Sequence, residues 1–252
     1  MNRKIHQACT YGGLVFVVLF GIGWALIAGF VPPPPPTTPA ADIAAFYADH
    51  RFIIIAGMFV VMVGVGCLMP FMASVSVQLA RIEGRWPVLA VSQVTIGVIN
   101  TVLLLIPVVM WTALAFRPDR DPTLIELLND TAWMFMLWPF STASIQNIIV
   151  GACILTDKSS APVYPRWFGY FNLWTSILLA GGGIMPFFMH GPFAWNGLFG
   201  FWTPAVTYLF WISMLMYFTL RAINAQAQDE AQSQERDGAG NVTATKVATS
   251  TC

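Results

Sequence analysis

The chain alternates between long apolar stretches and short segments that hold its charges and turn formers. Six stretches are apolar over about 20 residues or more, the length that an α-helix needs to cross a bilayer. They occupy residues 11–31, 52–79, 87–115, 131–155, 167–189 and 202–221. The pattern therefore predicts an all-α fold, a polytopic membrane bundle of six transmembrane helices.

The composition points to the same class of protein. Of 252 residues, 57% are hydrophobic and 10% are charged, whereas about 25% are charged in an ordinary soluble domain. Twelve basic and twelve acidic residues are too few to form the polar surface of a soluble globule of this length. The composition excludes a soluble domain, a nucleic-acid-binding protein and a disordered chain, and it indicates the lipid bilayer as a partner.

Lys and Arg residues are unevenly distributed between the predicted loops. If both termini are cytoplasmic, the outer loops hold only Arg51, Arg117 and Arg120. The cytoplasmic side then holds nine: Arg3, Lys4, Arg81, Arg85, Lys158, Arg166, Arg221, Arg236 and Lys246. Cytoplasmic loops carry the excess of basic residues, so the pattern predicts that both termini are cytoplasmic. The first stretch could instead be a signal peptide, but its apolar run of about 18 residues exceeds the 7–15 of a signal core and favours an anchor.

Tryptophans lie near the ends of the predicted spans, at Trp24, Trp86, Trp111, Trp133, Trp167 and Trp202. Amphipathic rings of this kind gather at the level of the lipid headgroups, and we expect these side chains there.

The segments outside the spans divide the chain into two parts. Residues 1–221 form the six-span membrane domain, and residues 222–252, rich in Ala, Gln, Ser and Thr, are expected to be a disordered cytoplasmic tail. The proline run at 32–36 predicts an extended polyproline II spacer, or else a docking site for a partner. Ile43, Phe46 and Tyr47 then recur at helical spacing, which predicts a short helix on the outer surface or a simple run-in to the second span.

No Asp, Glu, Lys, Arg or His lies well inside any of the six stretches. Such residues mark proton relays and charged-solute pathways, so the sequence argues against a pump or a proton-coupled carrier. The four cysteines show no CxxC or Cys/His spacing, and we expect no metal, no cofactor and no catalytic residue. A site on the outer face remains an alternative to plain solvated loops, and it would draw on His50, His190, Asp42, Asp49, Asp119 and Asp121. The third histidine, His6, is also expected beside a loop.

Uncharged amides are the main polar groups inside the spans. The candidates for a polar cavity are Gln78, Gln93, Asn100, Gln146, Asn147 and Asn172. An unpaired amide in hydrocarbon costs several kcal/mol, so these side chains are expected to face the interior of the bundle. They either form hydrogen bonds between helices or line a cavity, open to the cytoplasm, for a neutral or amphipathic small molecule.

Prolines and a triple glycine give the candidate helix breaks, at Pro70, Pro107, Pro139, Gly182 and Pro186. Proline removes a backbone hydrogen bond and kinks or breaks a helix. The segment LMPF around Pro70 is similar to LWPF around Pro139, and IPVVMW around Pro107 to MPFFMH around Pro186. These alignments suggest a repeated helical hairpin, with coincidence among 17 prolines as the alternative.

Residues 43–84 combine the segment IAAFYADHR, a glycine-containing apolar stretch and a charged RIEG turn. In these features the chain resembles uncharacterised bacterial membrane proteins of about six spans. The resemblance implies this topology and a bacterial inner-membrane location, and it implies no activity.

Three function classes follow from the sequence. The first is a non-enzymatic transport or accessory protein that handles a neutral or hydrophobic small molecule. The second is a structural subunit that packs against other membrane subunits. The third is an intramembrane enzyme, which the lack of titratable groups within the spans disfavours.

Overall fold

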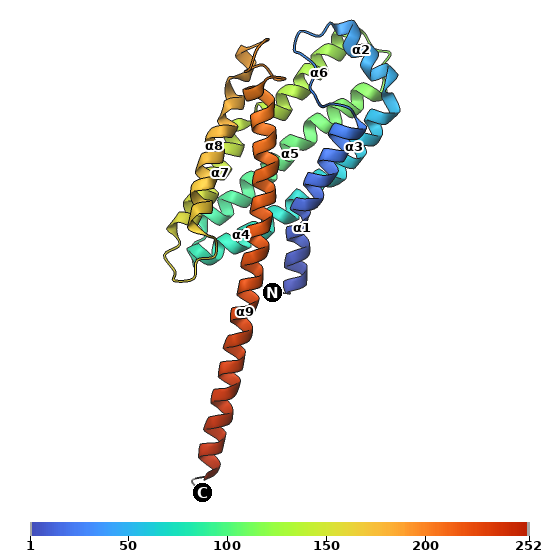
Figure 1. Ribbon diagram of the computed structural model, residues 1–252. Coiled ribbons are helices and arrows are strands. Elements are labelled where there is room, and N and C mark those ends of the chain that lie inside the picture. The colour runs from blue at the N-terminus through green and yellow to red at the C-terminus, as the bar shows by residue number, and fades with distance from the viewer. Residues whose placement is uncertain (1, 251–252) are drawn as a thin grey trace.

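The computed structural model describes the backbone of residues 2–250 and the side chains of residues 2–234, and this part of the chain contains helices and no β-strand (Figure 1). Its elements are α1 (Arg3–Phe20), η1 (Gly21–Ile27), α2 (Ala40–Asp49), α3 (Arg51–Gly66), α4 (Leu68–Glu83), α5 (Val88–Phe116), α6 (Pro122–Leu137), α7 (Phe140–Thr156), α8 (Arg166–Ala180), η2 (Gly181–Phe187), η3 (Leu198–Trp202) and α9 (Thr203–Ser250). The prediction of an all-α fold is confirmed for the described residues.

Five helices in the described part of the chain are long and apolar enough to cross a membrane. They are Arg3–Ile27, Arg51–Glu83, Val88–Phe116, Pro122–Thr156 and Leu198–Gln234. The fifth predicted span, 167–189, forms the α-helix α8 of 15 residues and then the 3₁₀ segment η2 of 7 residues. The α-helical part is therefore shorter than the ~20 residues of a standard crossing.

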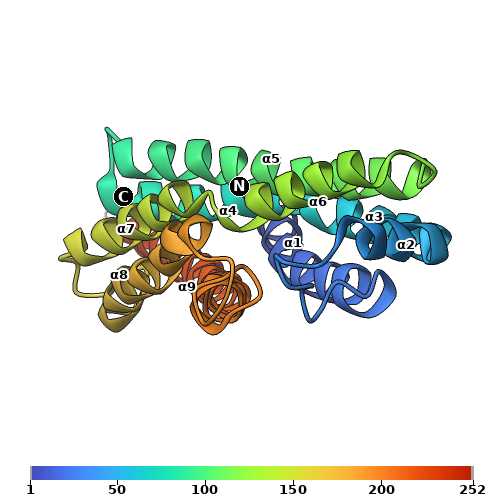
Figure 2. The ribbon, with the colours of Figure 1, turned by 90° about the horizontal axis from the view of Figure 1, so that it is seen from above.

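Helix α5 holds the bundle together, because it packs against α3, α4, α6 and α7. Seen from above, α5 and α6 lie along one side, and α1–α3 and α7–α9 form two groups against them (Figure 2). The two groups meet where α1 packs against α9. One end of the bundle carries α2 and the start of α6, and we call it the α2 end; the opposite end carries the N-terminus and is called the Arg3 end (Figure 1).

Two of the long spans are interrupted by a helix break. Cys67 separates α3 from α4, and Trp138 and Pro139 separate α6 from α7. The LMPF and LWPF motifs therefore both lie at breaks, as their similarity suggests. Pro70 itself lies in the first turn of α4, where the backbone N–H that proline lacks would have no partner within the helix.

The two motifs of the other proline alignment, around Pro107 and Pro186, differ from each other in structure. Pro107 was expected to break the third span, but α5 continues through it as one helix of 29 residues. Gly182 and Pro186 lie instead within η2, where the α-helix has already given way to a tighter 3₁₀ turn. Neighbouring helices on several sides of α5 hold it continuous despite the lost hydrogen bond.

The charged RIEG turn ends α4 and starts α5. The carboxylate oxygens of Glu83 accept hydrogen bonds from the backbone N–H groups of Leu89 (2.9 Å) and Ala90 (2.7 Å). These N–H groups lie in the first turn of α5 and have no partner within the helix, so the acid caps it. Gly84, with φ +74°, supplies the left-handed backbone conformation of the turn.

Glycines allow helix backbones to touch at two crossings. A Cβ atom at Gly23 would lie 2.6 Å from the carbonyl oxygen of Gly57, and one at Gly151 would lie 2.8 Å from that of Gly169. These pairs join η1 to α3 and α7 to α8. Close approach at small residues is the usual way in which helices associate in lipid.

The short helix predicted after the proline run is present as α2, and it packs on α6. Ile43 and Tyr47 are buried, and the Tyr47 hydroxyl donates to Oδ1 of Asn129 over 2.8 Å. The proline run likewise packs against the bundle, since Pro33 and Pro36 are buried. A spacing of three residues brings both to one side of a polyproline II helix.

Residues 222–250, which belong to the segment predicted to be a disordered tail, form part of helix α9. Helix α9 continues to Ser250 and extends beyond the rest of the bundle (Figure 1). Its residues Ala222 and Ile223 are buried, and Oδ1 of Asn224 accepts hydrogen bonds of 2.8 Å from Arg3 and Gln7. Ala, Gln and Glu are good helix formers, and each adds a hydrogen bond to a helix that the bundle has already nucleated. The packed part of α9 thus reaches past residue 221.

Candidate functional site

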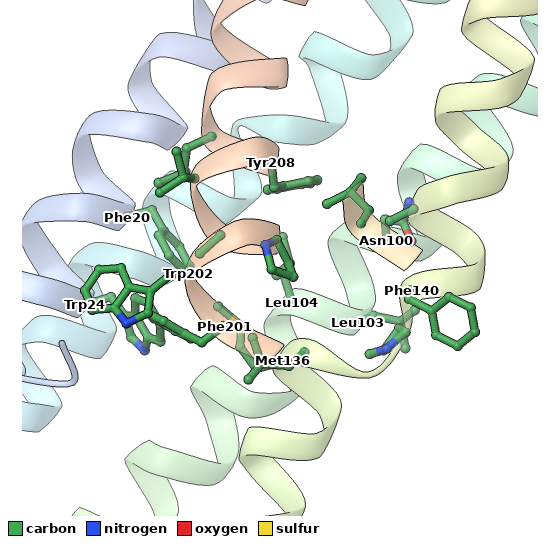
Figure 3. A pocket seen from close by; sticks show the side chains of 18 of the residues that line it. Phe20, Trp24, Asn100, Leu103, Leu104, Met136, Phe140, Phe201, Trp202 and Tyr208 are labelled. Carbon is green, nitrogen blue, oxygen red and sulfur yellow. The ribbon is translucent and has the colours of Figure 1, made fainter. Parts of the chain in front are cut away.

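A pocket of about 280 Å³ lies between the two groups of helices (Figure 3). Its wall is drawn from α1 and η1, α5, the break between α6 and α7, and η3 with α9. Most lining side chains are aromatic or aliphatic, and they include Phe20, Trp24, Leu103, Leu104, Met136, Phe140, Phe201, Trp202 and Tyr208. The volume is near the lower end of the ~300–1,000 Å³ of small-molecule sites, which are also mainly apolar.

The pocket lies where the surrounding spans depart from regular α-helix. The segments Gly21–Ile27 and Leu198–Trp202 have the wider π-helical geometry, and both contribute to the wall. Pro139, at the break between α6 and α7, also lines the pocket. Irregular turns of this kind are frequent at functional sites in helices.

An aromatic cluster closes one end of the pocket. The ring centroid of Trp24 lies 5.7 Å from that of Phe201, 5.8 Å from that of Trp133 and 6.1 Å from that of Trp111. The three indole N–H groups of Trp24, Trp111 and Trp133 are buried and have no hydrogen-bond partner among the described residues. Ring faces within this distance offer weak N–H···π contacts in place of hydrogen bonds.

Three of the six tryptophans expected at the headgroup level are buried inside the protein. Trp24 is 4% exposed, and Trp111 and Trp133 are fully buried, whereas Trp86, Trp167 and Trp202 are exposed. The ring of Phe30 covers Trp111 at a centroid distance of 4.8 Å. Rings from other segments cover these side chains, so a tryptophan near the end of an apolar stretch can still lie in the protein core.

Three of the six predicted cavity amides form a network around the sulfur of Met72. The Nε2 groups of Gln93 and Gln146 lie 3.4 Å and 3.3 Å from Met72 Sδ. Oε1 of Gln93 accepts from Ser76, and Oε1 of Gln146 accepts from Nδ2 of Asn100 over 2.8 Å. The network joins α4, α5 and α7.

The other three amides pair elsewhere between helices. Oδ1 of Asn147 accepts from Thr175 (2.6 Å), and Oδ1 of Asn172 accepts from the Trp211 indole (2.7 Å). Nε2 of Gln78 donates to Gln226 over 3.1 Å. The structure thus brings Asn100 alone, of the six, into the wall of the pocket. The remaining five form contacts that fix helix packing.

Asn100 lies at the end of the pocket opposite Trp24 and Phe20 (Figure 3). Its Nδ2 is used by Gln146, but its Oδ1 accepts no hydrogen bond from a described residue and is not enclosed. The Tyr208 hydroxyl and the Trp24 N–H also belong to residues of the wall, yet both atoms are covered and unpaired. The amide oxygen of Asn100 is therefore the accessible polar side-chain atom at this end.

Charged groups lie away from the pocket. Among the described residues that line it, none is Asp, Glu, Lys, Arg, His or Cys. The outer-loop residues serve local structure: the His50 ring approaches the Phe46 carbonyl, and Asp121 caps α6 through Thr123. Hydrogen bonds from the Thr123 side chain and backbone lower the pKa of Asp121. Within residues 2–234, no three His, Cys, Asp or Glu side chains are grouped so that they could hold a metal ion.

His6 differs from its expected place beside a loop. It lies within α1 and is 5% exposed, with Nε2 3.1 Å from the carbonyl oxygen of Ser74 on α4. Thr10, one turn further along α1, contacts the Ser74 hydroxyl. The three side chains join α1 to α4 near the Arg3 end and do not reach the pocket.

Sequence reasoning missed the aromatic wall of the pocket. Phe16, Phe20 and Trp24 are spaced four residues apart, and Phe201 and Tyr208 are seven residues apart. Either spacing places the residues on one face of a helix. That periodicity could have indicated a shared aromatic surface, although it does not say that the surface encloses a space. Comparisons with protein-family models, with curated proteins and with solved structures find no match to this chain.

Proposed function

We propose that this chain is a non-enzymatic transport or accessory protein that binds a neutral or hydrophobic small molecule in the pocket between α1, α5 and α9. The observation that carries the proposal is a pocket with an apolar wall, a single accessible amide and no charged side chain among its described residues. A charged ligand would leave its ion uncompensated in a medium of low dielectric, so a neutral ligand fits this wall.

The proposal includes six crossings in a bacterial inner membrane, with both termini in the cytoplasm. Large apolar side chains are exposed over the bundle, among them Phe52 (76%) and Phe59 (70%), which suits contact with lipid tails. The contact between Arg3 and Asn224 brings the start of α1 and the packed end of α9 to one face. The basic residues at 81, 85, 158 and 166 lie in or beside loops at that end, in agreement with the excess of positive charge on cytoplasmic loops.

The crossing that this proposal adds to the five long helices, the fifth along the chain, is α8 followed by η2. The 3₁₀ turn rises about 2.0 Å per residue against 1.5 Å for the α-helix, so η2 lengthens the segment more than an α-helix of equal length. Close packing of α8 on α7 through Gly151 and Gly169 supports its place inside the bundle.

A second candidate is a structural subunit of a larger membrane complex. It is favoured by the five amides that pair between helices and leave no polar group for a ligand. The pocket favours the first proposal, because a subunit that acts only by packing has no need for a space of this size between its helices.

The test is to fill the pocket. Ala143 lines it from α7, whereas Ala73 on α4 is exposed on the outside of the bundle. We expect the wild-type protein and Ala73→Trp, purified from native membranes, to carry one dominant neutral amphiphile by mass spectrometry, and Ala143→Trp to lose it. Equal recovery from all three proteins, or recovery of a stoichiometric protein partner and no small molecule, would contradict the proposal.

A further inference from the structure

We propose that the ligand of this pocket carries a hydrogen-bond donor, such as a hydroxyl group, at its polar end, and that this donor binds Oδ1 of Asn100. The inference rests on the proposed function and adds the chemical class of the ligand. It follows from the order of donors and acceptors in the amide network behind the pocket.

The thioether sulfur of Met72 determines the orientation of that network. A thioether accepts weakly and has no hydrogen to donate. Gln93 and Gln146 both lie next to Sδ and must therefore turn their Nε2 groups toward it, at 3.4 Å and 3.3 Å. If either amide were reversed, its oxygen would face the lone pairs of the sulfur with no hydrogen between them.

The orientation of Gln146 in turn fixes that of Asn100 in the wall of the pocket. With its Nε2 on the sulfur, Gln146 presents Oε1 to Asn100, and Asn100 has to donate Nδ2 to it over 2.8 Å. The remaining polar atom of Asn100 is then Oδ1, which is not enclosed and has no partner among the described residues. The network thus leaves an acceptor, and not a donor, in the pocket wall.

The neighbouring backbone has the same polarity. Pro107 has no N–H, so the carbonyl of Leu103, also in the pocket wall, lacks the donor that an α-helix normally supplies four residues on. Pro139 leaves the carbonyl of Phe135, another lining residue, in the same position. Two donors of the wall, Trp24 Nε1 and the Tyr208 hydroxyl, are covered by other side chains, and the third, the indole N–H of the exposed Trp202, lies on η3 and not beside Asn100 (Figure 3).

This polarity selects among neutral amphiphiles. A long-chain alcohol or an acylglycerol with a free hydroxyl can donate to Oδ1 and lay its chain along the aromatic and aliphatic wall. A quinone, an ether or a fully esterified lipid offers only acceptors and would bring oxygen against oxygen. A site built for a donor discriminates strongly against an analogue that lacks it, because the buried acceptor stays unpaired.

The experiment compares 1-decanol with its methyl ether, which keeps the oxygen and loses the donor. Binding to the purified full-length protein is measured by native mass spectrometry from detergent micelles, with Ala143→Trp as the filled-pocket background. We expect wild type to bind 1-decanol about three- to tenfold more tightly than the ether, the factor that one neutral hydrogen bond contributes. Asn100→Leu is expected to bind both compounds alike.

Met72→Leu tests whether the sulfur of Met72 determines the orientation of Gln146 and Asn100. Leucine keeps the volume but removes the acceptor, so Gln146 and Asn100 are free to reverse, and we expect binding to persist while the preference for the alcohol falls. Met58→Leu, the same change at a buried site on α3 that is outside the pocket wall, is the matched control and is expected to keep the preference.

The outcomes separate this inference from the function on which it rests. If Ala143→Trp lowers the binding of both compounds but wild type prefers the ether or neither, the donor inference is overturned and the pocket remains a binding site. If Ala143→Trp changes the binding of neither compound, the proposed function itself fails. If Asn100→Leu keeps the full preference for the alcohol, another group makes the contact and the assignment to Asn100 is wrong.

Discussion

The indole N–H of Trp195 donates a hydrogen bond of 2.7 Å to the carbonyl oxygen of Pro34, 161 residues earlier in the chain. The bond joins two loops at the α2 end, the proline run and the segment before η3. A proline run has no N–H groups, so its carbonyls are its only backbone polar atoms, and an outside donor is needed to satisfy one that is covered. The run is thereby held against the bundle rather than left as a spacer.

We predict that Trp195→Phe loosens this end of the protein. The phenyl ring keeps much of the contact with Trp133, whose ring is stacked at a centroid distance of 6.5 Å, but Pro34 loses its donor. The expected loss is ~1 kcal/mol, the net worth of a typical hydrogen bond. It is measured as a lower thermal unfolding midpoint in detergent and as faster proteolysis within residues 32–39.

Trp133→Phe is the matched control for that substitution. The indole N–H of Trp133 is already buried and unpaired, so its removal takes away a desolvation cost of ~1–3 kcal/mol that offsets part of the lost ring contact. We expect Trp133→Phe to be less destabilising than Trp195→Phe. An equal or larger loss for Trp133→Phe would mean that the hydrogen bond to Pro34 contributes little.

Gly57→Ala is predicted to be strongly destabilising. A Cβ atom there would lie 2.5 Å from the carbonyl oxygen of Gly23 and 2.8 Å from the Cβ of Ala28, so η1 and α3 would have to move apart. Overpacking of this kind costs ~1–3 kcal/mol or more. Gly66→Ala, at the end of the same helix, meets no atom within 4 Å and is expected to be neutral or slightly stabilising. Both are compared by chemical unfolding in detergent, and equal stability of the two variants would contradict the close crossing.

The buried pair Asn172 and Trp211 is predicted to be energetically coupled. Asn172 accepts from the Trp211 indole and donates Nδ2 to the Phe168 carbonyl of its own helix over 2.7 Å. A double-mutant cycle with Asn172→Leu and Trp211→Phe should give a coupling of ~0.6–2 kcal/mol, as for polar contacts between membrane helices. The same cycle between Asn172 and Trp167, an exposed ring on α8, serves as the reference and is expected to give a value near zero. Additivity at Trp211 would show that the bond does not stabilise the bundle.

The loop between α7 and α8 is predicted to weaken in acid. Partial burial raises the pKa of Asp157, but hydrogen bonds from the Ser159 hydroxyl and from the Ser159 and Val163 N–H groups outweigh it and leave the pKa below its ordinary value. A carboxyl with a lowered folded-state pKa contributes its full stability above the unfolded pKa and loses it as the pH falls through the folded value. Hydrogen exchange at Ser159 and Val163, corrected for intrinsic rates, should therefore lose protection as the pH is lowered from 7 to below the ordinary pKa.

Asp157→Asn tests the source of that pH dependence. The amide keeps the shape of the side chain and removes the charge, so protection of the two N–H groups should be lower at pH 7 and nearly constant with pH. Asp119→Asn, in an exposed loop at the other end of the bundle, is expected to leave the profile unchanged. A wild-type profile that is flat over this range would refute the role assigned to Asp157.

The positions of the helices could be predicted far better than their contacts. The length of the apolar stretches locates five of the expected spans. A run of about 20 apolar residues is by itself enough to predict a helix that crosses a bilayer. The same measure does not show that Trp111 and Trp133 are buried, because the aromatic rings that cover them come from other segments of the chain. It also misses that Ala222 is buried and that Asn224 binds α1, since small and polar residues carry no apolar signal.

The candidate site shows the same division. The sequence indicates that six amides turn inward, because an amide facing lipid has no partner. It does not indicate which partner each one meets: Asn172 meets Trp211, Gln146 meets Met72 and Asn100, and Asn100 alone reaches the pocket. Any of these amides could pair with several donors or acceptors, and the choice depends on how the helices are rotated about their axes.

By itself, then, the amino-acid sequence determines that this protein is helical, that several of its helices are long and apolar enough for a membrane, and that its spans hold amides in place of charges. Only the tertiary structure decides that Trp195 closes on Pro34, that glycines bring η1 against α3, and that irregular turns surround one pocket. The physical reason is that the preference for lipid or water depends on the composition of each segment alone. Hydrogen-bond pairing and pockets between helices depend on surfaces that come together from distant segments. Helices that are apolar over most of their length carry little information about which surfaces those are.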